Sequence, residues 1–232
     1  MGKLKKYLML AGIIILVLGL GGLAYYIFET VNYFTTQDAS VTADMVTITP
    51  EITGKLIEWN AVVGEEVKSG QILGKQDISS LVTSSALSPQ TLSSSADTLV
   101  SKADIKSPLD GKVIVSNVVK GQVLSPGMEV ATIADTDHCY IKANIEETNI
   151  LHIQPGQKVD IKIDAYPGKN FTGYVDNVGQ ATNSALGTSI SLNTSGTYSK
   201  VTQLIPVRIN ITNADNLVLM PGMNATVKIH IN

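Results

Sequence analysis

Residue types that build metal sites, disulfide frameworks and nucleic-acid interfaces are scarce in this chain. Its 232 residues include one cysteine, Cys139, and three histidines, and the formal net charge at pH 7 is −3. A single cysteine excludes a disulfide framework and any cysteine-cluster zinc or iron–sulfur site. The net negative charge argues against an electrostatic nucleic-acid binder. With 16% charged residues, against about 25% in an average domain, the chain is poor in charge but not disordered. Three histidines leave little material for metal chemistry, and from these scarcities together we do not expect an enzyme.

One long apolar run lies near the N-terminus. Residues 8–28 are 21 consecutive uncharged, mostly apolar residues. At about 1.5 Å per residue they span roughly 30 Å, the thickness of a bilayer core. Lysines at positions 3, 5 and 6 precede the run, whereas the first charges after it are Glu29 and Asp38. This asymmetry predicts a single transmembrane helix in the cell membrane, with its N-terminus in the cytoplasm and the bulk of the chain outside.

A cleaved signal peptide is the competing interpretation of the apolar run. The sequence Gly22-Leu23-Ala24 loosely resembles a cleavage site, but the run is longer than the usual apolar region of 7–15 residues. A retained helix is therefore favoured. Aromatic residues at its outer end would form an interfacial belt: Tyr25, Tyr26, Phe28, Tyr33 and Phe34.

An internal repeat follows the apolar run. PEITGKLIEWNAVVGEEVKSGQIL begins at Pro50, and PLDGKVIVSNVVKGQVLSPGMEV begins at Pro108. Three pairs of glycines lie 57 residues apart, with the same intervals in both copies: Gly54 and Gly111, Gly64 and Gly121, Gly70 and Gly127. The first glycine of each copy is predicted to open a strand, and the later two to lie in tight turns. We expect the two copies to pack on each other as a small sandwich.

The repeat resembles the split halves of biotinyl/lipoyl-type domains. Carrier domains of that type hold a modifiable lysine in a Met-Lys-Met tip, which neither Lys75 nor Lys102 matches. No cofactor is therefore expected. Residues 78–103 join the halves and contain nine serines and Pro89. Because proline interrupts helices and serine favours them little, this segment is predicted to be a linker with at most one or two helical turns.

The C-terminal part alternates apolar and polar residues, a pattern typical of strands with one buried and one wet face. The clearest segments are 141–146, 159–164, 207–212 and 227–232. Residues 38–48 alternate in the same way and are predicted to form one strand of the same sheet. Residues 146–153 favour one short helix, and residues 180–200, rich in Ser, Thr, Asn and Gly, favour a loop.

The order of these segments resembles a known family. After the apolar run come TTQDASVTADMVTITPEITGKL, the two halves, IKANIEETNILHIQPGQKVDIKIDAYPGKNFTGYVDNVG, QLIPVRI and LMPGMNATVKI. This order is similar, over nearly the whole chain, to that of membrane fusion proteins, or periplasmic adaptors, of the HlyD/EmrA type. The resemblance implies a mainly β chain with an N-terminal transmembrane helix, a split lipoyl-like (barrel-sandwich hybrid) domain and a β-barrel adaptor domain.

The expected organisation comprises seven segments. They are a cytoplasmic tail (1–7), a transmembrane helix (8–28), a linker with the first barrel strand (29–48), the first lipoyl-like half (49–77), the Ser-rich linker in place of a hairpin (78–103), the second half (104–135) and the β-barrel domain (136–232).

The resemblance also implies a function and partners. Members of this family are non-enzymatic subunits of export or multidrug efflux systems, which self-associate and work outside the membrane with an inner-membrane transporter. The PVRI segment at 206–209 favours adaptors of major-facilitator exporters, although adaptors of ABC transporters share much of the pattern. Members that reach an outer-membrane channel carry a long α-helical hairpin between the halves. Two arms of roughly ten residues would extend only about 15 Å, so direct contact with such a channel is not expected.

No catalytic, cofactor-binding or metal-binding residue is predicted. His138 and Cys139 are adjacent soft ligands, but no third or fourth ligand lies nearby in the sequence, so packing is favoured. Four acidic residues lack the spacing of a calcium loop and are assigned to a solvated face: Asp135, Asp137, Glu146 and Glu147. Trp59 is expected to pack between the halves rather than to contact a partner.

Two other classes remain open at this point. A swinging-arm carrier would need a modified lysine. A free-standing surface module, anchored in the membrane but acting without a transporter, would fit the apolar run and the β segments equally well. Only the family resemblance favours the adaptor over that module.

Overall fold

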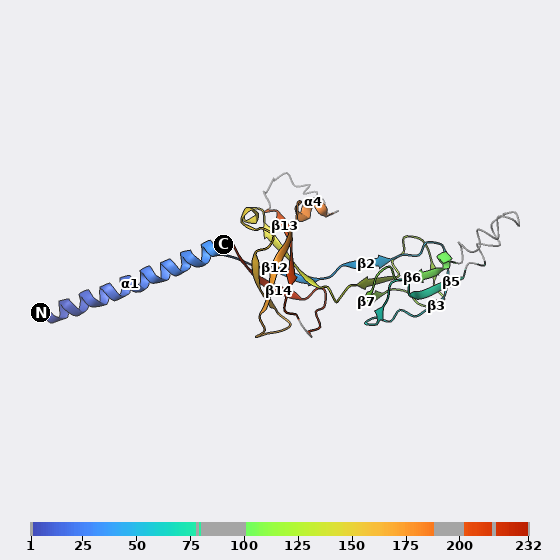
Figure 1. Ribbon diagram of the computed structural model, residues 1–232, viewed down its shortest axis with the longest axis horizontal. Coiled ribbons are helices and arrows are strands. Elements are labelled where there is room, and N and C mark those ends of the chain that lie inside the picture. Colours follow the sequence, from blue (N-terminus) through green and yellow to red (C-terminus); the bar gives the residue numbers. More distant parts are fainter. Residues whose placement is uncertain (1, 78, 80–100, 188–201, 215–216, 232) are drawn as a thin grey trace, which may run out of the picture. The chain divides into compact units, whose positions relative to one another are not determined.

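The computed structural model describes residues 2–77, 79, 101–187, 202–214 and 217–231 (Figure 1). Two compact units make up the chain. One consists of Met1–Thr42 together with Tyr140–Asn232, and the other is Ala43–Cys139. The structure is mainly β, with an N-terminal apolar helix, a six-stranded barrel in the first unit and two four-stranded sheets in the second. The predicted fold class is confirmed.

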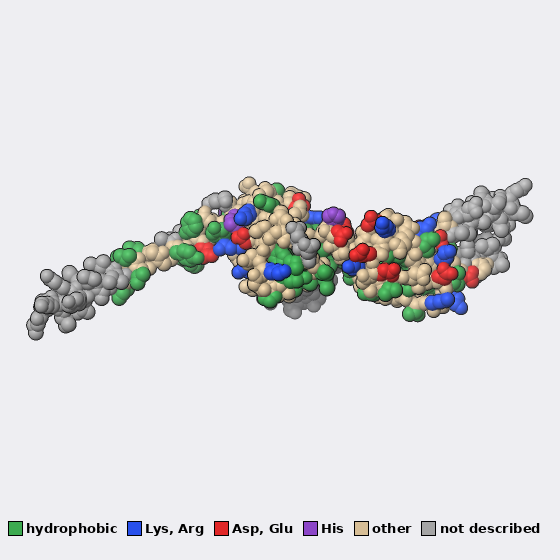
Figure 2. Space-filling view, turned by 60° about the horizontal axis from the view of Figure 1, so that its bottom comes forward, with side chains coloured by type: hydrophobic (Ala, Val, Ile, Leu, Met, Phe, Trp, Pro, Cys, Tyr) green, Lys and Arg blue, Asp and Glu red, His purple; other side chains and the backbone are tan. Residues whose placement is uncertain are grey.

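Helix α1 (Gly2–Asn32) contains the whole predicted apolar run. Its apolar residues surround the helix instead of forming one stripe, which is typical of a helix that lipid or protein covers on all sides. The window Ile15–Asn32 has a mean hydropathy of 1.4, and none of it is buried. Hydrophobic side chains cover the described part of α1 (Figure 2). The helix is long and apolar enough to cross a membrane.

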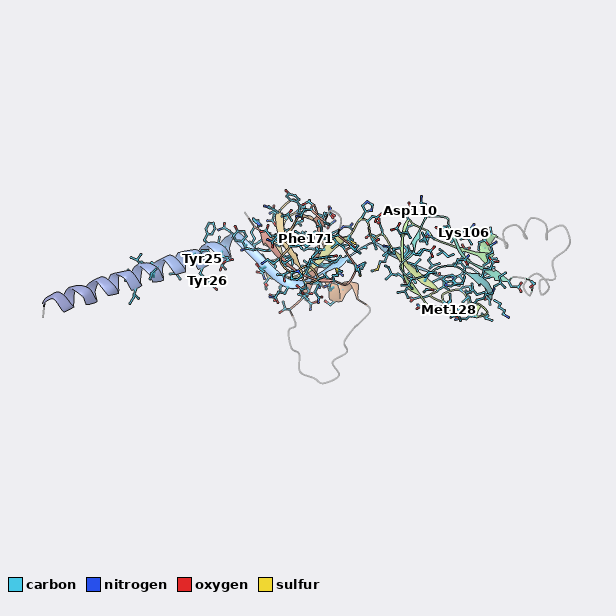
Figure 3. The ribbon with its side chains drawn as sticks, turned by 90° about the horizontal axis from the view of Figure 1, so that it is seen from below. Tyr25, Tyr26, Lys106, Asp110, Met128 and Phe171 are labelled. Atoms are coloured by element: carbon cyan, nitrogen blue, oxygen red, sulfur yellow. The ribbon has the colours of Figure 1, made fainter. Side chains whose placement is uncertain are left out.

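The barrel closes in the order β1-β10-β13-β12-β11-β14. Its strands are β1 (Tyr33–Thr42), β10 (Tyr140–Glu146), β11 (Lys158–Ile163), β12 (Phe171–Val178), β13 (Leu204–Ile211) and β14 (Asn224–His230). All neighbours are antiparallel. Alternate side chains fill the interior, as Val159 and Ile161 of β11 do, together with Phe171 (Figure 3). The predicted alternation of buried and exposed side chains is confirmed for 141–146, 159–164, 207–210 and 227–230, whereas Ile211 and Ile231 are only partly buried and residue 232 lies outside the described residues.

The single strand predicted over residues 38–48 is wrong. The chain forms β1 in the barrel and then a separate strand, β2 (Met45–Ile48), in the other unit. Strand β2 pairs with β9 (Ala131–Ala134), from Met45 opposite Ala134 to Ile48 opposite Ala131. Apolar residues at 39, 41, 43 and 45 keep the period of two past the end of β1, so the pattern did not show that the chain leaves the barrel there.

The second unit consists of two sheets, ordered β2-β9-β7-β4 and β6-β5-β3-β8. The remaining strands are β3 (Gly54–Trp59), β4 (Glu66–Val67), β5 (Ile72–Asp77), β6 (Asp104–Lys106), β7 (Gly111–Ser116) and β8 (Val123–Leu124). The repeat maps one sheet onto the other, because β3 corresponds to β7 and β4 to β8 at an offset of 57. The sandwich prediction is confirmed, with one addition: each half lends its short strand, β4 or β8, to the sheet of the other half.

The hydrogen bonds repeat with the same offset. The Gly64 N–H donates to the Val113 carbonyl (2.8 Å), and the Gly121 N–H donates to the Leu56 carbonyl (2.7 Å). Gly64 has φ of 90° and Gly121 has φ of 94°, values that L side chains rarely adopt. The predicted role of these two turn glycines is therefore confirmed.

Trp59 lies where the two halves meet. Its indole Nε1–H donates to Ser116 Oγ at 2.9 Å, and residue 116 is the position that corresponds to 59 in the other copy. The ring is packed against the buried cluster that includes Leu56 and Ile133. These contacts show that Trp59 packs between the two halves, as expected, and is not held out for a partner.

Two short helical turns lie in the barrel unit. Residues 146–153 contain a single 3-10 turn, η1 (Ile150–His152), as predicted. Within the predicted loop 180–200, residues Asn183–Leu186 form α4, whose N-terminus is capped by Thr182; residues 188–201 lie outside the described residues. In the predicted linker, residues 101–103 are helical, and residues 78 and 80–100 lie outside the described residues.

Candidate functional site

The C-terminal strand holds the end of α1 against the barrel. Helix α1 passes into β1 without an intervening residue, and β1 pairs with β14 so that Tyr33 lies opposite His230. Lys228 of β14 reaches back to the last turn of α1, where its Nζ lies 2.9 Å from Glu29 Oε1. The same Nζ lies 4.1 Å from the centroid of the Tyr33 ring, within range of a cation–π contact. The hydrogen bond with Glu29 raises the pKa of Lys228.

His230 adds a second set of contacts at this point. Its ring meets Tyr33 edge-on, with 4.8 Å between centroids and 81° between planes, and its Nε2 lies 2.7 Å from Asp160 Oδ2. The Ile231 N–H donates to the carbonyl of Asn32, the last helical residue, at 2.9 Å. Charged and histidine side chains gather where α1 meets the barrel (Figure 2). We call the set Glu29, Asn32, Tyr33, Asp160, Lys228, His230 and Ile231 the helix–barrel joint.

The joint attaches strand β14 to the end of the helix and to the start of β1. One exposed ion pair contributes only about 0–1 kcal/mol. Here the ion pair of Glu29 and the backbone hydrogen bond of Asn32 hold the last turn of α1, and the cation–π and edge-on ring contacts hold Tyr33, the first residue of β1. Helix α1 ends at Asn32 and β1 begins at Tyr33, so no linker separates them. Sequence reasoning missed this site, since 199 residues separate Glu29 from Lys228.

The acidic and soft-ligand residues considered from the sequence do not form one site. Asp135 and Asp137 belong to the second unit, whereas Glu146 and Glu147 belong to the first. Among the described residues, no three His, Cys, Asp or Glu side chains are grouped as metal ligands would be. Cys139 is half-buried and its Sγ–H donates to the Thr136 carbonyl at 3.3 Å. Burial raises the pKa of the Cys139 thiol, which disfavours the reactive thiolate.

His138 is paired with Asp135, and this pairing leads to a prediction. Its Nδ1 lies 2.8 Å from Asp135 Oδ2, and this hydrogen bond raises the pKa of His138. The folded pKa thus lies above the unfolded value of about 6.5, so the pair stabilises the fold at low pH, and this stabilisation is lost as pH rises through the folded pKa. We expect an NMR titration of the His138 ring to give a higher pKa in the native chain than in the Asp135→Asn variant.

Asp137→Asn is the matched control, because the charge of Asp137 makes the smallest of the contributions that raise the pKa of His138. It should lower the His138 pKa less than Asp135→Asn does. Equal effects of the two substitutions would show that the imidazole responds to the net local charge and not to the hydrogen bond.

The repeat exposes apolar side chains in the loops that follow β3 and β7. Val62, Val63 and Val119 lie in these loops, and Val123 is the first residue of β8. We call these four the loop valines; their exposed fractions are 64%, 60%, 69% and 62%. Val62 and Val119 occupy corresponding positions of the two copies. The hydrogen bonds of Gly64 and Gly121 hold the turns that carry Val62, Val63 and Val119.

Comparison with known proteins gives both units a counterpart. The YknX-like beta-barrel domain matches residues 139–229, and the CzcB-like, barrel-sandwich hybrid domain matches residues 44–135. The two matches coincide with the barrel and with the two-sheet unit.

Relatives match this chain over 57% to 87% of its length. The putative efflux system component YhbJ of Bacillus subtilis is 38% identical over 201 residues, which cover 87% of this chain and 81% of that protein. The colistin resistance protein EmrA of Acinetobacter baumannii is 33% identical over 133 residues, covering 57% of this chain but only 38% of EmrA. A crystal structure of a MacA-MexA chimeric protein has the same fold, with a TM-score of 0.69, 20% identity, and coverage of 87% of this chain and 82% of the chimera.

An N-terminal apolar helix, a barrel-sandwich hybrid domain and a six-stranded barrel define a non-enzymatic adaptor. The chain belongs to the HlyD/EmrA-type membrane fusion protein, or periplasmic adaptor, family, whose members are components of efflux systems and work with inner-membrane transporters. Strand β5 ends at Asp77 and β6 begins at Asp104, so that 26 residues stand where long-hairpin members have their hairpin.

Proposed function

We propose that the chain is a single-pass adaptor that works outside the membrane beside one inner-membrane exporter, with a major-facilitator exporter favoured over an ABC transporter. The helix–barrel joint carries this proposal, because it connects the barrel without a linker to a helix that can share the bilayer with the exporter. The PVRI segment of β13 supports the major-facilitator type.

The proposed topology places residues 1–7 in the cytoplasm and residues 8–28 in the membrane. The three lysines before the run favour this direction, and the barrel and barrel-sandwich hybrid domains then lie outside. The short segment 78–103 supports an assembly that releases substrate outside the cell without docking to an outer-membrane channel.

Coupling to transport follows from differential contact. An adaptor affects an exporter only if it binds one of the exporter's conformations more tightly than another. Because the joint has no linker, the contact between the barrel and the exporter depends on the tilt of the adaptor's own helix as well as on the exporter surface. The adaptor thereby favours one exporter conformation or guides substrate outward.

The test is affinity purification of the tagged full chain from detergent-solubilised native membranes, with mild cross-linking and mass spectrometry. We expect an exporter at abundance comparable to that of the bait, and the sequence of that exporter identifies its class. A tagged, unrelated single-span protein is the control for proteins that merely share the membrane. Repeated recovery of the chain alone, or with cell-wall components only, would favour a free-standing surface module.

We further infer that copies of the chain associate with one another through the loop valines. Four valines that are each 60–69% exposed lose unfavourable contact with water when a second copy covers them. We expect the double variant Val62→Asp/Val119→Asp to reduce cross-linked oligomers at least tenfold while the thermal unfolding midpoint stays near that of the native chain. Val218→Asp, at a 61% exposed position of the barrel unit, is the matched control; an equal loss with it would contradict a specific surface.

A further inference from the structure

Leu151 is an exposed apolar side chain that the fold does not explain. It is 85% exposed, more than any other large hydrophobic residue among those described. The neighbouring Ile153 is 5% exposed and belongs to the barrel core. Turn η1 thus directs Leu151 into solvent, whereas Ile153, the residue that follows the turn, is buried.

The position of Leu151 is fixed by hydrogen bonds around η1. The Ile153 N–H donates to the Ile150 carbonyl at 3.0 Å. The Gln157 side chain closes the loop from the other side, because its Oε1 accepts from the Gln154 N–H (3.0 Å) and its Nε2 donates to the His152 carbonyl (2.9 Å). These hydrogen bonds fix the backbone of η1, and Leu151 is exposed because of the conformation of this turn.

The same amide group attaches η1 to the end of α1. Gln157 Nε2 also donates to the Ile231 carbonyl at 3.2 Å, and the Ile231 N–H donates to the carbonyl of Asn32. Leu151 is therefore carried on the part of the barrel that adjoins the last residue of the helix, and η1 and the end of α1 lie near each other in Figure 1.

We propose that Leu151 inserts into the outer leaflet of the lipid bilayer. Tyr25, Tyr26 and Phe28 are exposed on the last turns of α1, and Tyr25 and Tyr26 project from the helix in Figure 3. From Phe28 to Asn32 the helix rises about 6 Å, and the polar region of one leaflet is about 5–8 Å deep. Turn η1 is linked through Gln157 and Ile231 to Asn32, so we place Leu151 near the level of the lipid head groups, where a leucine side chain gains by reaching the acyl chains.

Lipid is the occupant that the geometry favours. The helix holds Leu151 at this depth in every copy, with or without a partner protein. The residues around it in the turn, Asn149, His152 and Gln154, are polar without being acidic or basic clusters, so the contact is apolar and does not depend on anionic head groups. The proposal rests on the membrane topology given under Proposed function. The test below distinguishes failure of the lipid contact from failure of that topology.

The test uses the full chain in phosphatidylcholine nanodiscs without any exporter. In a Cys139→Ser background, Leu151→Cys is labelled with an NBD fluorophore, and quenching by lipid carrying a doxyl group at acyl position 5 is measured. Val218→Cys is the matched control, because it is 61% exposed and lies in the β13–β14 connection, at the opposite end of the barrel from Glu146 and η1. Val17→Cys in α1 reports insertion of the helix.

We expect at least twofold quenching at positions 17 and 151, and less than 1.2-fold at 218. Quenching at 17 without quenching at 151 would overturn the lipid contact and leave the membrane topology intact. Absence of quenching at both 17 and 151 would overturn the topology itself. A blue shift of the fluorophore at 151 that appears only after the co-purified exporter is added, without doxyl quenching, would assign Leu151 to a protein contact instead.

Discussion

A chain without residues 1–28 does not restore export in cells that lack the native protein, although both β units fold. Tethering in one membrane raises the effective concentration of two partners to the millimolar range, and the deletion removes this advantage together with the helical turn that presents Glu29 to Lys228. None of the buried core residues among those described belongs to α1, so folding persists. The measurement is growth in the presence of the toxic substrate of the co-purified exporter.

Replacement of residues 8–28 by an unrelated apolar helix of equal length is the control for this deletion. It should restore most of the export, because the membrane tether and Glu29 both remain. Circular dichroism of the deleted protein should show the β signal and a cooperative thermal transition. Full export activity of the soluble fragment would contradict the anchoring role.

Gly173→Ala destabilises the barrel by about 3 kcal/mol, at the upper end of the usual range for overpacked sites. A Cβ at residue 173 would lie 2.2 Å from the Asn210 carbonyl oxygen and 3.0 Å from Ile161 Cδ1. The obstructing oxygen belongs to the backbone of β13. In a closed barrel β13 cannot move away from β12 without losing its pairing with β10. Urea unfolding of residues 29–232 measures the loss.

Gly156→Ala separates crowding from backbone strain. Gly156 has φ of 89°, and an added Cβ would meet no atom within 4 Å, so only the cost of the left-handed conformation applies, about 1–2 kcal/mol. The loss for Gly173→Ala should be the larger of the two. If Gly156→Ala were equally or more destabilising, close approach of β12 and β13 would not be what requires glycine at 173.

The internal repeat made much of the two-sheet unit predictable. A glycine at a turn leaves a trace in the sequence because few other residues tolerate φ near 90°, and two copies at one spacing reinforce that trace. The exchange of β4 and β8 between sheets left no such trace. Each is only two residues long, and Val67 or Leu124 would be buried in either sheet, so local pattern does not decide the pairing.

The helix–barrel joint and Leu151 were beyond sequence reasoning for a different reason. Glu29 and Lys228 meet only because β14 pairs with β1, and the sequence pattern gave both strands without their partners. In Ile150-Leu151-His152-Ile153 the apolar residues are equivalent by composition. Only the single 3-10 turn decides that Ile153 faces the core and Leu151 faces away from it.

The exchange of β4 and β8 has a consequence for the covalent chain. Neither half can detach without removing a strand from each sheet, so the halves are held together by interleaving and not by residues 78–103. A proteolytic cut within that segment would convert one polypeptide into two that remain associated and unfold together. Insertions there would cost little, because loop closure depends only weakly on length. The joining segment is thus a place where this architecture can gain or lose length without disturbing either sheet.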